Sequence, residues 1–226
     1  HHLSRINGFK RINNFGKLSF QYDFQRNYRL EFDVRRGEDK DNASLDLKLD
    51  THTLKLDLDS NLSDVIHLKT GLMGQYQNNF VNPDTGVRRL IPDYDKYDLG
   101  IYAIVDYQLN QKLLLEAGTR FDYTYMNVFK FYQTSFWESR NYDELFPEIV
   151  VEVYNNQILT NPQLNFYNPS VTIGATYSFD EDYKLFFNYS LKIIHSPFFM
   201  KFSANLYLRV LVSPVVTFFI FTSLHK

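Results

Sequence analysis

The stretch that decides the fold is residues 171–191, which read VTIGATYSFDEDYKLFFNYSL. Apolar residues occupy every second position on both sides of an acidic turn at residues 180–182. Because alternate side chains of a β-strand point to opposite faces, each arm has one apolar face and one face of small or polar residues. The pattern predicts a long antiparallel hairpin whose two faces meet different surroundings.

The composition of the 226-residue chain excludes several kinds of protein. There is no cysteine, so the chain has neither a disulfide framework nor a thiolate site. A net charge of −2 and a pI near 6.3 provide no basic surface, and we expect no nucleic-acid partner. The longest apolar run, residues 206–222, contains Arg209 and Pro214 and is not expected to form a transmembrane helix.

The same alternation recurs along the chain and predicts an all-β antiparallel meander of about eight long strands. Within one of them the apolar positions change from odd to even numbers, which predicts a β-bulge around residues 51–53. The expected strands cover residues 17–25, 28–34, 45–58, 66–76, 97–107, 113–123, 171–179 and 183–191.

The predicted connections alternate strictly between short and long. Tilted strands of about 9–11 residues cross a bilayer, and outer-membrane barrels place short turns on the periplasmic side and long loops outside. The pattern therefore favours a partial transmembrane barrel over a half-buried soluble sheet, which shows the same alternation. The short connections are expected at 26–27, 59–64, 109–111 and 180–182, and the long ones at 35–44, 77–96 and 124–169.

In this interpretation the apolar face contacts outer-membrane lipid. Only a closed barrel satisfies the backbone of a sheet in hydrocarbon. Such barrels carry aromatic girdles at both membrane interfaces, and several tyrosines near predicted strand ends fit these girdles. They are Tyr22, Tyr28, Tyr97, Tyr107, Tyr123 and Tyr183.

Four segments carry a resemblance to one family: residues 18–38, 74–100, 134–148 and 161–191. The runs NPDTGVRRLIPDYD and SFWESRNYDELFPE within them are far more specific than the alternation. On these residues the chain resembles, over about residues 1–191, the TonB-dependent receptors of the outer membrane. The resemblance implies part of a barrel of about 22 strands in a Gram-negative bacterium. It also implies active uptake of a scarce nutrient, such as an iron–siderophore chelate, with a plug domain and TonB as partners.

Neither the plug nor the TonB-contacting segment is expected within this chain. Its first residues have no basic start, apolar core and cleavage site of a signal peptide. We therefore expect an internal fragment of the barrel that does not function alone. The resemblance stops at Leu191, after which the chain contains no Asp, Glu or Gly. Residues 192–226 are interpreted as an aberrant tail, from a frame change, gene disruption or mis-joined end; the alternative is a genuine divergent tail.

Candidate ligand-binding residues lie in the long loops. Guanidinium groups suit carboxylates and phosphates, and aromatic rings add stacking surface, although the same residues could instead hold the loops together. The ligand candidates are Arg88, Arg89, Tyr94, Tyr97, Trp137, Arg140 and Tyr142. Strand parity places a second set on the wet side of the sheet, where they would face the lumen and its plug. These are Lys69, Gln75, Glu116, Arg120 and Asp122.

The sequence predicts no catalytic site, metal site or cofactor. The six histidines have no metal-ligand spacing, and the run PDYDKYD lacks the glycine and final glutamate of a calcium loop. Asp143, Glu144 and Glu148 have no histidine or nucleophile beside them. Two alternatives to the receptor remain: a soluble β-sheet binding module with aromatic-rich loops, and a small outer-membrane barrel that acts as an adhesin or pore.

Overall fold

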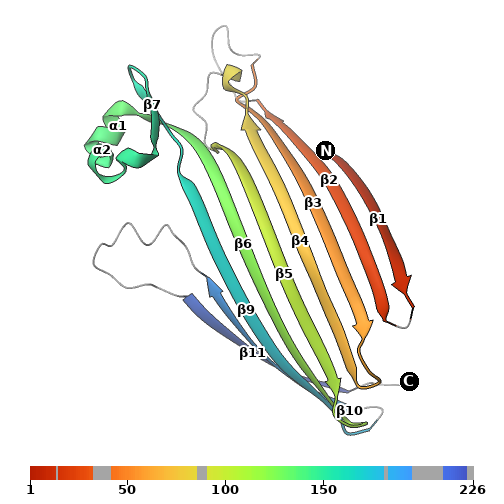
Figure 1. The fold of residues 1–226 in the computed structure, drawn as a ribbon. Helices are drawn as coiled ribbons and strands as arrows, with labels where there is room; N and C mark the ends of the chain where they lie inside the picture. The colour runs from red at the N-terminus through yellow and green to blue at the C-terminus, as the bar shows by residue number, and fades with distance from the viewer. Residues whose placement is uncertain (14, 33–41, 86–90, 181–182, 195–210, 223–226) are drawn as a thin grey trace.

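The computed structural model describes residues 1–13, 15–32, 42–85, 91–180, 183–194 and 211–222, the last of these by its backbone alone. A single curved sheet dominates it (Figure 1). The strands of this sheet are β1 (His2–Ile12), β2 (Gly16–Glu31), β3 (Leu45–Asn61), β4 (Ile66–Val81), β5 (Asp93–Gln108), β6 (Leu113–Gln133), β9 (Gln163–Ser178), β10 (Tyr183–Ile194) and β11 (Leu211–Thr222).

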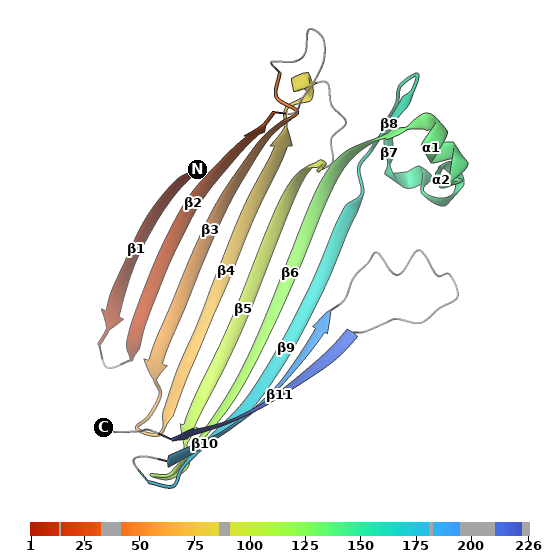
Figure 2. The ribbon, with the colours of Figure 1, turned by 180° about the vertical axis from the view of Figure 1, so that it is seen from behind.

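The strands follow one another in chain order, and every neighbouring pair is antiparallel. The prediction of an all-β antiparallel meander is therefore confirmed. Within the described residues, β1 and β11 each have a neighbour on one side only, so the sheet is open at both edges (Figure 2). This is the geometry of a partial barrel wall.

The predicted hairpin at residues 171–191 is present as β9 and β10. Leu185 lies opposite Tyr177, and Tyr189 lies opposite Ile173, so the apolar positions of the two arms share one face. Pro169, expected in a loop, is instead part of β9. On β9, the residues paired with β10 begin at Ser170, directly after this proline, which has no N–H to donate.

The first two predicted strands are wrong in their boundaries. The first expected strand begins at residue 17, but the chain already forms β1 before it, and β1 pairs with β2. The expected turn at residues 26–27 does not form, because β2 continues through it to Glu31. Arg26 interrupts the apolar pattern without ending the strand, since its guanidinium is paired with Asp50 on β3 at 2.7 and 2.9 Å.

The predicted bulge at residues 51–53 is also wrong. β3 pairs with β2 and with β4 in an unbroken register across these residues. Leu47 and Leu49 therefore lie on the opposite face from Leu54 and Leu56, and the change of parity is a real change of face. The polarity of the two faces of β3 is exchanged along its length, with no extra residue inserted.

The connections alternate as expected once the first is moved to residues 13–15. At one end of the sheet the chain passes from β1 to β2, β3 to β4, β5 to β6 and β9 to β10, and at the other end it passes from β2 to β3, β4 to β5 and β6 to β9 (Figure 1). The longest, after β6, folds into a small unit that we call the cap. The cap comprises α1 (Thr134–Ser139), α2 (Tyr142–Leu145), η3 (Pro147–Ile149), β7 (Val150–Val153) and β8 (Gln157–Thr160).

The hydrophobic core is small and lies away from the middle of the sheet. Among the described residues the buried apolar side chains are Val81, Val128, Trp137 and Ile158, all at the long-connection end or in the cap. A further short helix, η2 (Pro83–Thr85), follows β4. None of the described helices is long and apolar enough to span a membrane.

Candidate functional site

One face of the sheet is apolar and exposed. The register aligns Phe20, Leu56, Leu72, Ile101 and Phe121 in one row across β2 to β6. All five are exposed, with Ile101 at 51%. Soluble monomers rarely expose apolar patches of more than a few hundred Å², so this row requires an apolar partner.

An aromatic row borders this face toward the long connections. Phe24, His52, Tyr76, Tyr97 and Tyr125 lie opposite one another on β2 to β6. Their ring centroids are 4.9, 6.1, 4.9 and 6.2 Å apart in that order. This is the arrangement of an interfacial girdle.

The height of the apolar face matches a bilayer. On β5 the face extends from Tyr97 to Tyr107. Ten residues of strand span about 33 Å along its axis, and the tilt of about 35–45° found in barrel strands reduces this to about 25 Å, the height of the apolar band of such barrels.

The opposite face is polar and cross-linked. Arg5 Nε donates to Asp23 Oδ1 at 2.5 Å, and Gln75 Nε2 donates to Thr53 Oγ1 at 2.9 Å. Arg120 makes two hydrogen bonds to Asp122, both 2.7 Å long. Such polar and charge-assisted hydrogen bonds between neighbouring residues and strands suit a wet surface, because their remaining donors and acceptors can bind water.

A glycine allows one of these links to cross a whole strand. The Tyr102 hydroxyl on β5 donates to Asp57 Oδ1 on β3 at 2.8 Å, and Gly71 of β4 lies between them. A Cβ at Gly71 would be 2.5 Å from Asp57 Oδ1 and 2.6 Å from Tyr102 Cε1. Only glycine leaves room for this contact.

The five residues expected on the wet side share the polar face. Lys69 and Gln75 stand at odd positions of β4, opposite even positions of β5, and the even positions of β5 lie opposite Glu116, Arg120 and Asp122 on β6. They therefore lie on one surface, at different levels along β4 and β6. That this surface lines a lumen and faces a plug stays a prediction.

The five ligand candidates within the described residues lie in three different places. Tyr97 is part of the aromatic row, while Tyr94 occupies an even position of β5 and lies on the polar face. Trp137, Arg140 and Tyr142 are in the cap. Arg88 and Arg89 lie outside the described residues. A ligand-binding role for these residues stays a prediction.

The aromatic residues of the cap pack against one another. The Trp137 side chain is 2% exposed, and its ring centroid lies 5.2 Å from those of Tyr132 and Tyr142. Phe136 stacks on Tyr132 with an interplanar angle of 9°, and the Arg140 guanidinium lies over Phe136. Trp137 therefore stabilises the cap and offers almost no surface to a ligand.

The end of the cap carries one perturbed titratable group. The Tyr154 hydroxyl donates to Glu152 Oε2 at 2.6 Å, and this hydrogen bond raises the pKa of Tyr154. Within the described residues, no three side chains of His, Asp or Glu converge in a way that would hold a metal ion.

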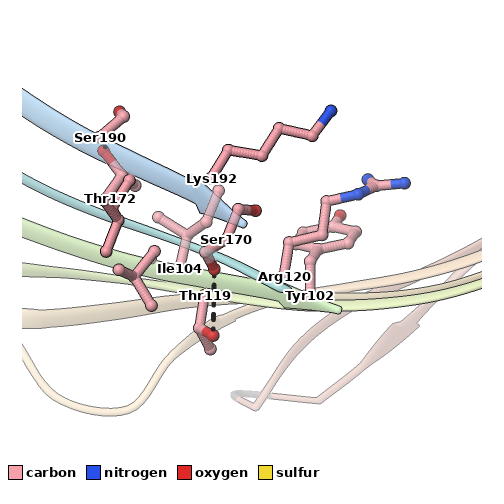
Figure 3. A pocket seen from close by; sticks show the side chains of 11 residues that line it. Tyr102, Ile104, Thr119, Arg120, Ser170, Thr172, Ser190 and Lys192 are labelled. Carbon is pink, nitrogen blue, oxygen red and sulfur yellow. Dashed lines mark hydrogen bonds between the residues drawn. The ribbon is translucent and has the colours of Figure 1, made fainter. Parts of the chain in front are cut away.

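A groove of about 680 Å³ lies on the polar face, where β5, β6, β9 and β10 meet (Figure 3). The side chains of Arg120 and Lys192 extend from its rim, and Ser170 lies between them. Sequence reasoning missed this groove and the Tyr102–Asp57 link, because both depend on which residues are opposite across strands far apart in sequence.

A long antiparallel meander with one exposed apolar face, an aromatic border and a cross-linked polar face defines a class: the wall of a transmembrane β-barrel. The chain belongs to the TonB dependent receptor-like β-barrel family, whose sequence model matches residues 3–191. Members of this family are transport receptors of the bacterial outer membrane rather than enzymes. No curated protein matches the chain.

Proposed function

We propose that the chain is part of the barrel wall of a TonB-dependent receptor for a scarce nutrient such as an iron–siderophore chelate. The observation that carries the proposal is the family match over residues 3–191 on a sheet with unlike faces. In this proposal the apolar face contacts lipid of a Gram-negative outer membrane, and the long connections with the cap are extracellular. The polar face contacts the receptor's plug domain.

Transport would require parts outside these residues. The uptake step depends on a plug and on energy supplied through TonB, and the wall must close. The described sheet has open edges at β1 and β11, and strand number, tilt and diameter are linked in a closed barrel. We therefore propose that residues 1–226 alone do not transport.

Residues 192–226 are proposed to be distinct from the receptor barrel in origin. The family match ends at Leu191, and acidic residues and glycine are absent beyond it. β11 pairs with β10 through its backbone, which strands of any origin can do. The nucleotide sequence across codons 191 and 192 tests this: an intact frame with barrel-like sequence in related genes would contradict it.

Uptake of radiolabelled iron chelates by iron-limited cells tests the proposed function. Deletion of the gene that contains this sequence should abolish uptake of at least one chelate, and the complete gene should restore it. A strain without TonB should show the same loss. A gene limited to residues 1–226 behind an export signal should not restore uptake. Unchanged uptake of every supplied chelate in the deletion strain would contradict the iron-chelate assignment.

A further inference from the structure

The face that carries the aromatic row extends beyond it toward the long connections. The residues two positions further along β2 to β6 form what we call the second row: Arg26, Asp50, Asn78, Asp95 and Asn127. Residues two apart on a strand share a face and lie about 7 Å from each other. None of the five is apolar, so the face changes from apolar to polar at this level.

The side chains of the second row are held by hydrogen bonds. Arg26 donates to both carboxylate oxygens of Asp50, at 2.7 and 2.9 Å. Asp95 Oδ1 accepts from Asn78 Nδ2 at 2.9 Å and from the Tyr76 hydroxyl of the aromatic row at 2.7 Å. Because these planar groups are already oriented, a partner that binds them pays little for ordering them.

The second row keeps donors and acceptors for a partner. Arg26 uses two of its five guanidinium N–H donors on Asp50. Asp95 Oδ2 accepts no hydrogen bond from the described residues. The Asn127 side-chain oxygen accepts from Asn161 at 2.8 Å, and its amide group carries two N–H donors as well. The row therefore presents both kinds of hydrogen-bonding group side by side.

A third row lies two residues beyond the second on β2 to β4. It consists of Tyr28, Lys48 and Phe80. Tyr28 is 51% exposed and Phe80 is 48% exposed. Lys48 Nζ lies 3.3 Å from Asp50 Oδ2, so its charge is shared with the second row. Two aromatic rings are therefore exposed outside the apolar band, beyond the reach of lipid chains.

The position of the two rows defines their surroundings. They continue the lipid-facing side of the wall past the aromatic row, which marks the membrane interface. In the proposed function this end of the wall is extracellular. The layer against the two rows is then the headgroup layer of the outer leaflet, which in a Gram-negative outer membrane consists of glycolipid with a phosphorylated saccharide headgroup.

The side chains of the two rows suit the saccharide better than its phosphates. A sugar ring has hydroxyl groups at its edge and C–H groups on its faces. Planar carboxylate, amide and guanidinium groups bind neighbouring hydroxyls, and aromatic rings pack on the C–H faces. A phosphate site would need an excess of cations, whereas the two rows contain two cations, Arg26 and Lys48, and two carboxylates, Asp50 and Asp95.

We propose that the second and third rows form a binding surface for the saccharide headgroup of outer-leaflet glycolipid. Asn78 and Asp95 bind hydroxyl groups of the sugars, and Tyr28 and Phe80 pack on the faces of the rings. The inference rests on the proposed function, since it requires the apolar face to contact the outer membrane.

Binding of two glycolipids to the receptor tests the proposal. The receptor expressed from the gene that contains this sequence would be purified in detergent, titrated with each glycolipid and analysed by native mass spectrometry. One glycolipid is lipopolysaccharide with its core sugars, and the other is lipid A, which keeps the acyl chains and phosphates but lacks the core. We expect the first to bind about tenfold more tightly, because a few added hydrogen bonds together give a factor of this order.

A pair of double variants locates the effect on one face. Asn78→Leu with Asp95→Leu should lower the preference for core sugars to about twofold or less. Gln77→Leu with Lys96→Leu is the matched control, because these two residues are also opposite each other on β4 and β5 but lie on the other face. The control should keep the tenfold preference.

The exposed rings provide a second variant that puts little demand on folding. Tyr28→Ser with Phe80→Ser changes side chains that are about half exposed, and substitutions at exposed positions usually have small effects on stability. The preference for core sugars should fall in this variant too. An unchanged preference would overturn the role of the third row.

Equal affinities of the unmodified receptor for the two glycolipids would overturn the proposal, and this comparison requires no variant to fold. Equal losses in the Asn78–Asp95 and Gln77–Lys96 double variants would also overturn it. A second copy or another protein that copurifies in stoichiometric amount and cross-links to the two rows would show a different occupant. The measurement involves no uptake, so a failed iron-uptake experiment leaves its result unaffected.

Discussion

The sheet and the cap differ in where their apolar side chains lie. In the sheet, the residues of the row through Leu72 and Ile101 are exposed, while in the cap the Trp137 side chain is 2% exposed. The cap packs aromatic residues around the buried Trp137 within about 30 residues of chain. Within the described residues, no second layer covers the apolar face of the sheet, so this face depends on its surroundings. Burial of apolar side chains in this chain therefore depends on the element: the cap has a buried centre at Trp137, and the row across the sheet has none.

The largest expected effect concerns the cap. Trp137→Ala should destabilise the cap by about 3–5 kcal/mol, the usual cost of removing a buried Trp. Hydrogen exchange of residues 134–160 should accelerate while exchange in β4 stays unchanged. Phe136→Ala is the matched control, because Phe136 is 39% exposed and should cost less than half as much. Equal acceleration in β4 would show that sheet and cap are one cooperative unit.

The next effect separates the two faces of the sheet. Leu72→Arg places a charge on the apolar face and should cost about 2–4 kcal/mol at the bilayer midplane. Met73→Arg, one residue further on the polar face, should cost far less. The measurement is the amount of folded receptor in outer membranes. Equal losses for the two variants would contradict the assignment of faces.

A smaller effect is expected at the strand-crossing link. Gly71→Ala should displace Tyr102 from Asp57 and cost about 1–3 kcal/mol, through lost hydrogen bonding and overpacking. Gly74→Ala is the control, since nothing lies within 4 Å of a Cβ there. Urea unfolding in lipid vesicles compares the two. Equal effects of the two substitutions would contradict the requirement for glycine at the Tyr102–Asp57 hydrogen bond.

The smallest expected effect is a titration in the cap. The pKa of Tyr154 should lie above 10.0, the ordinary pKa of tyrosine, because its hydroxyl donates to Glu152. Because the pKa of Tyr154 is higher in the folded state, the protonated hydroxyl stabilises the cap at every pH below the unfolded-state pKa. This stabilisation is lost as the pH rises through the folded-state pKa. Nuclear magnetic resonance of ring-labelled tyrosine measures this pKa. Glu152→Gln should lower it, and an unchanged pKa in that variant would exclude the hydrogen bond as its cause.

The alternation was sufficient to predict the class of fold and the hairpin at residues 171–191. It predicted the wrong boundaries where a polar residue lies within a strand. Arg26 looked like a turn because a charge stood at an apolar position, yet its partner Asp50 is on the neighbouring strand. The parity change in β3 predicted a bulge, because one face of the strand was expected to stay apolar along its whole length. The structure instead exchanges the apolar and polar faces without a bulge.

The candidate sites were less predictable than the fold. Trp137 and Tyr142 were expected to contact a ligand, and their partners in the cap became visible only once the chain was folded. The second and third rows gave no signal in the sequence. Their residues come together only through the register of β2 to β6, as Asn78 and Asp95 do through the pairing of β4 with β5.

β6 is the longest strand, with 21 residues from Leu113 to Gln133, and the aromatic row crosses it at Tyr125. Its last eight residues, 126–133, extend the strand by about 26 Å beyond that row, where β9 and then β8 continue to pair with it. Strand pairing along β6 therefore continues from the sheet into the cap, first with β9 and then with β8. Separation of the cap from the sheet would require the backbone hydrogen bonds between β6 and these two strands to break.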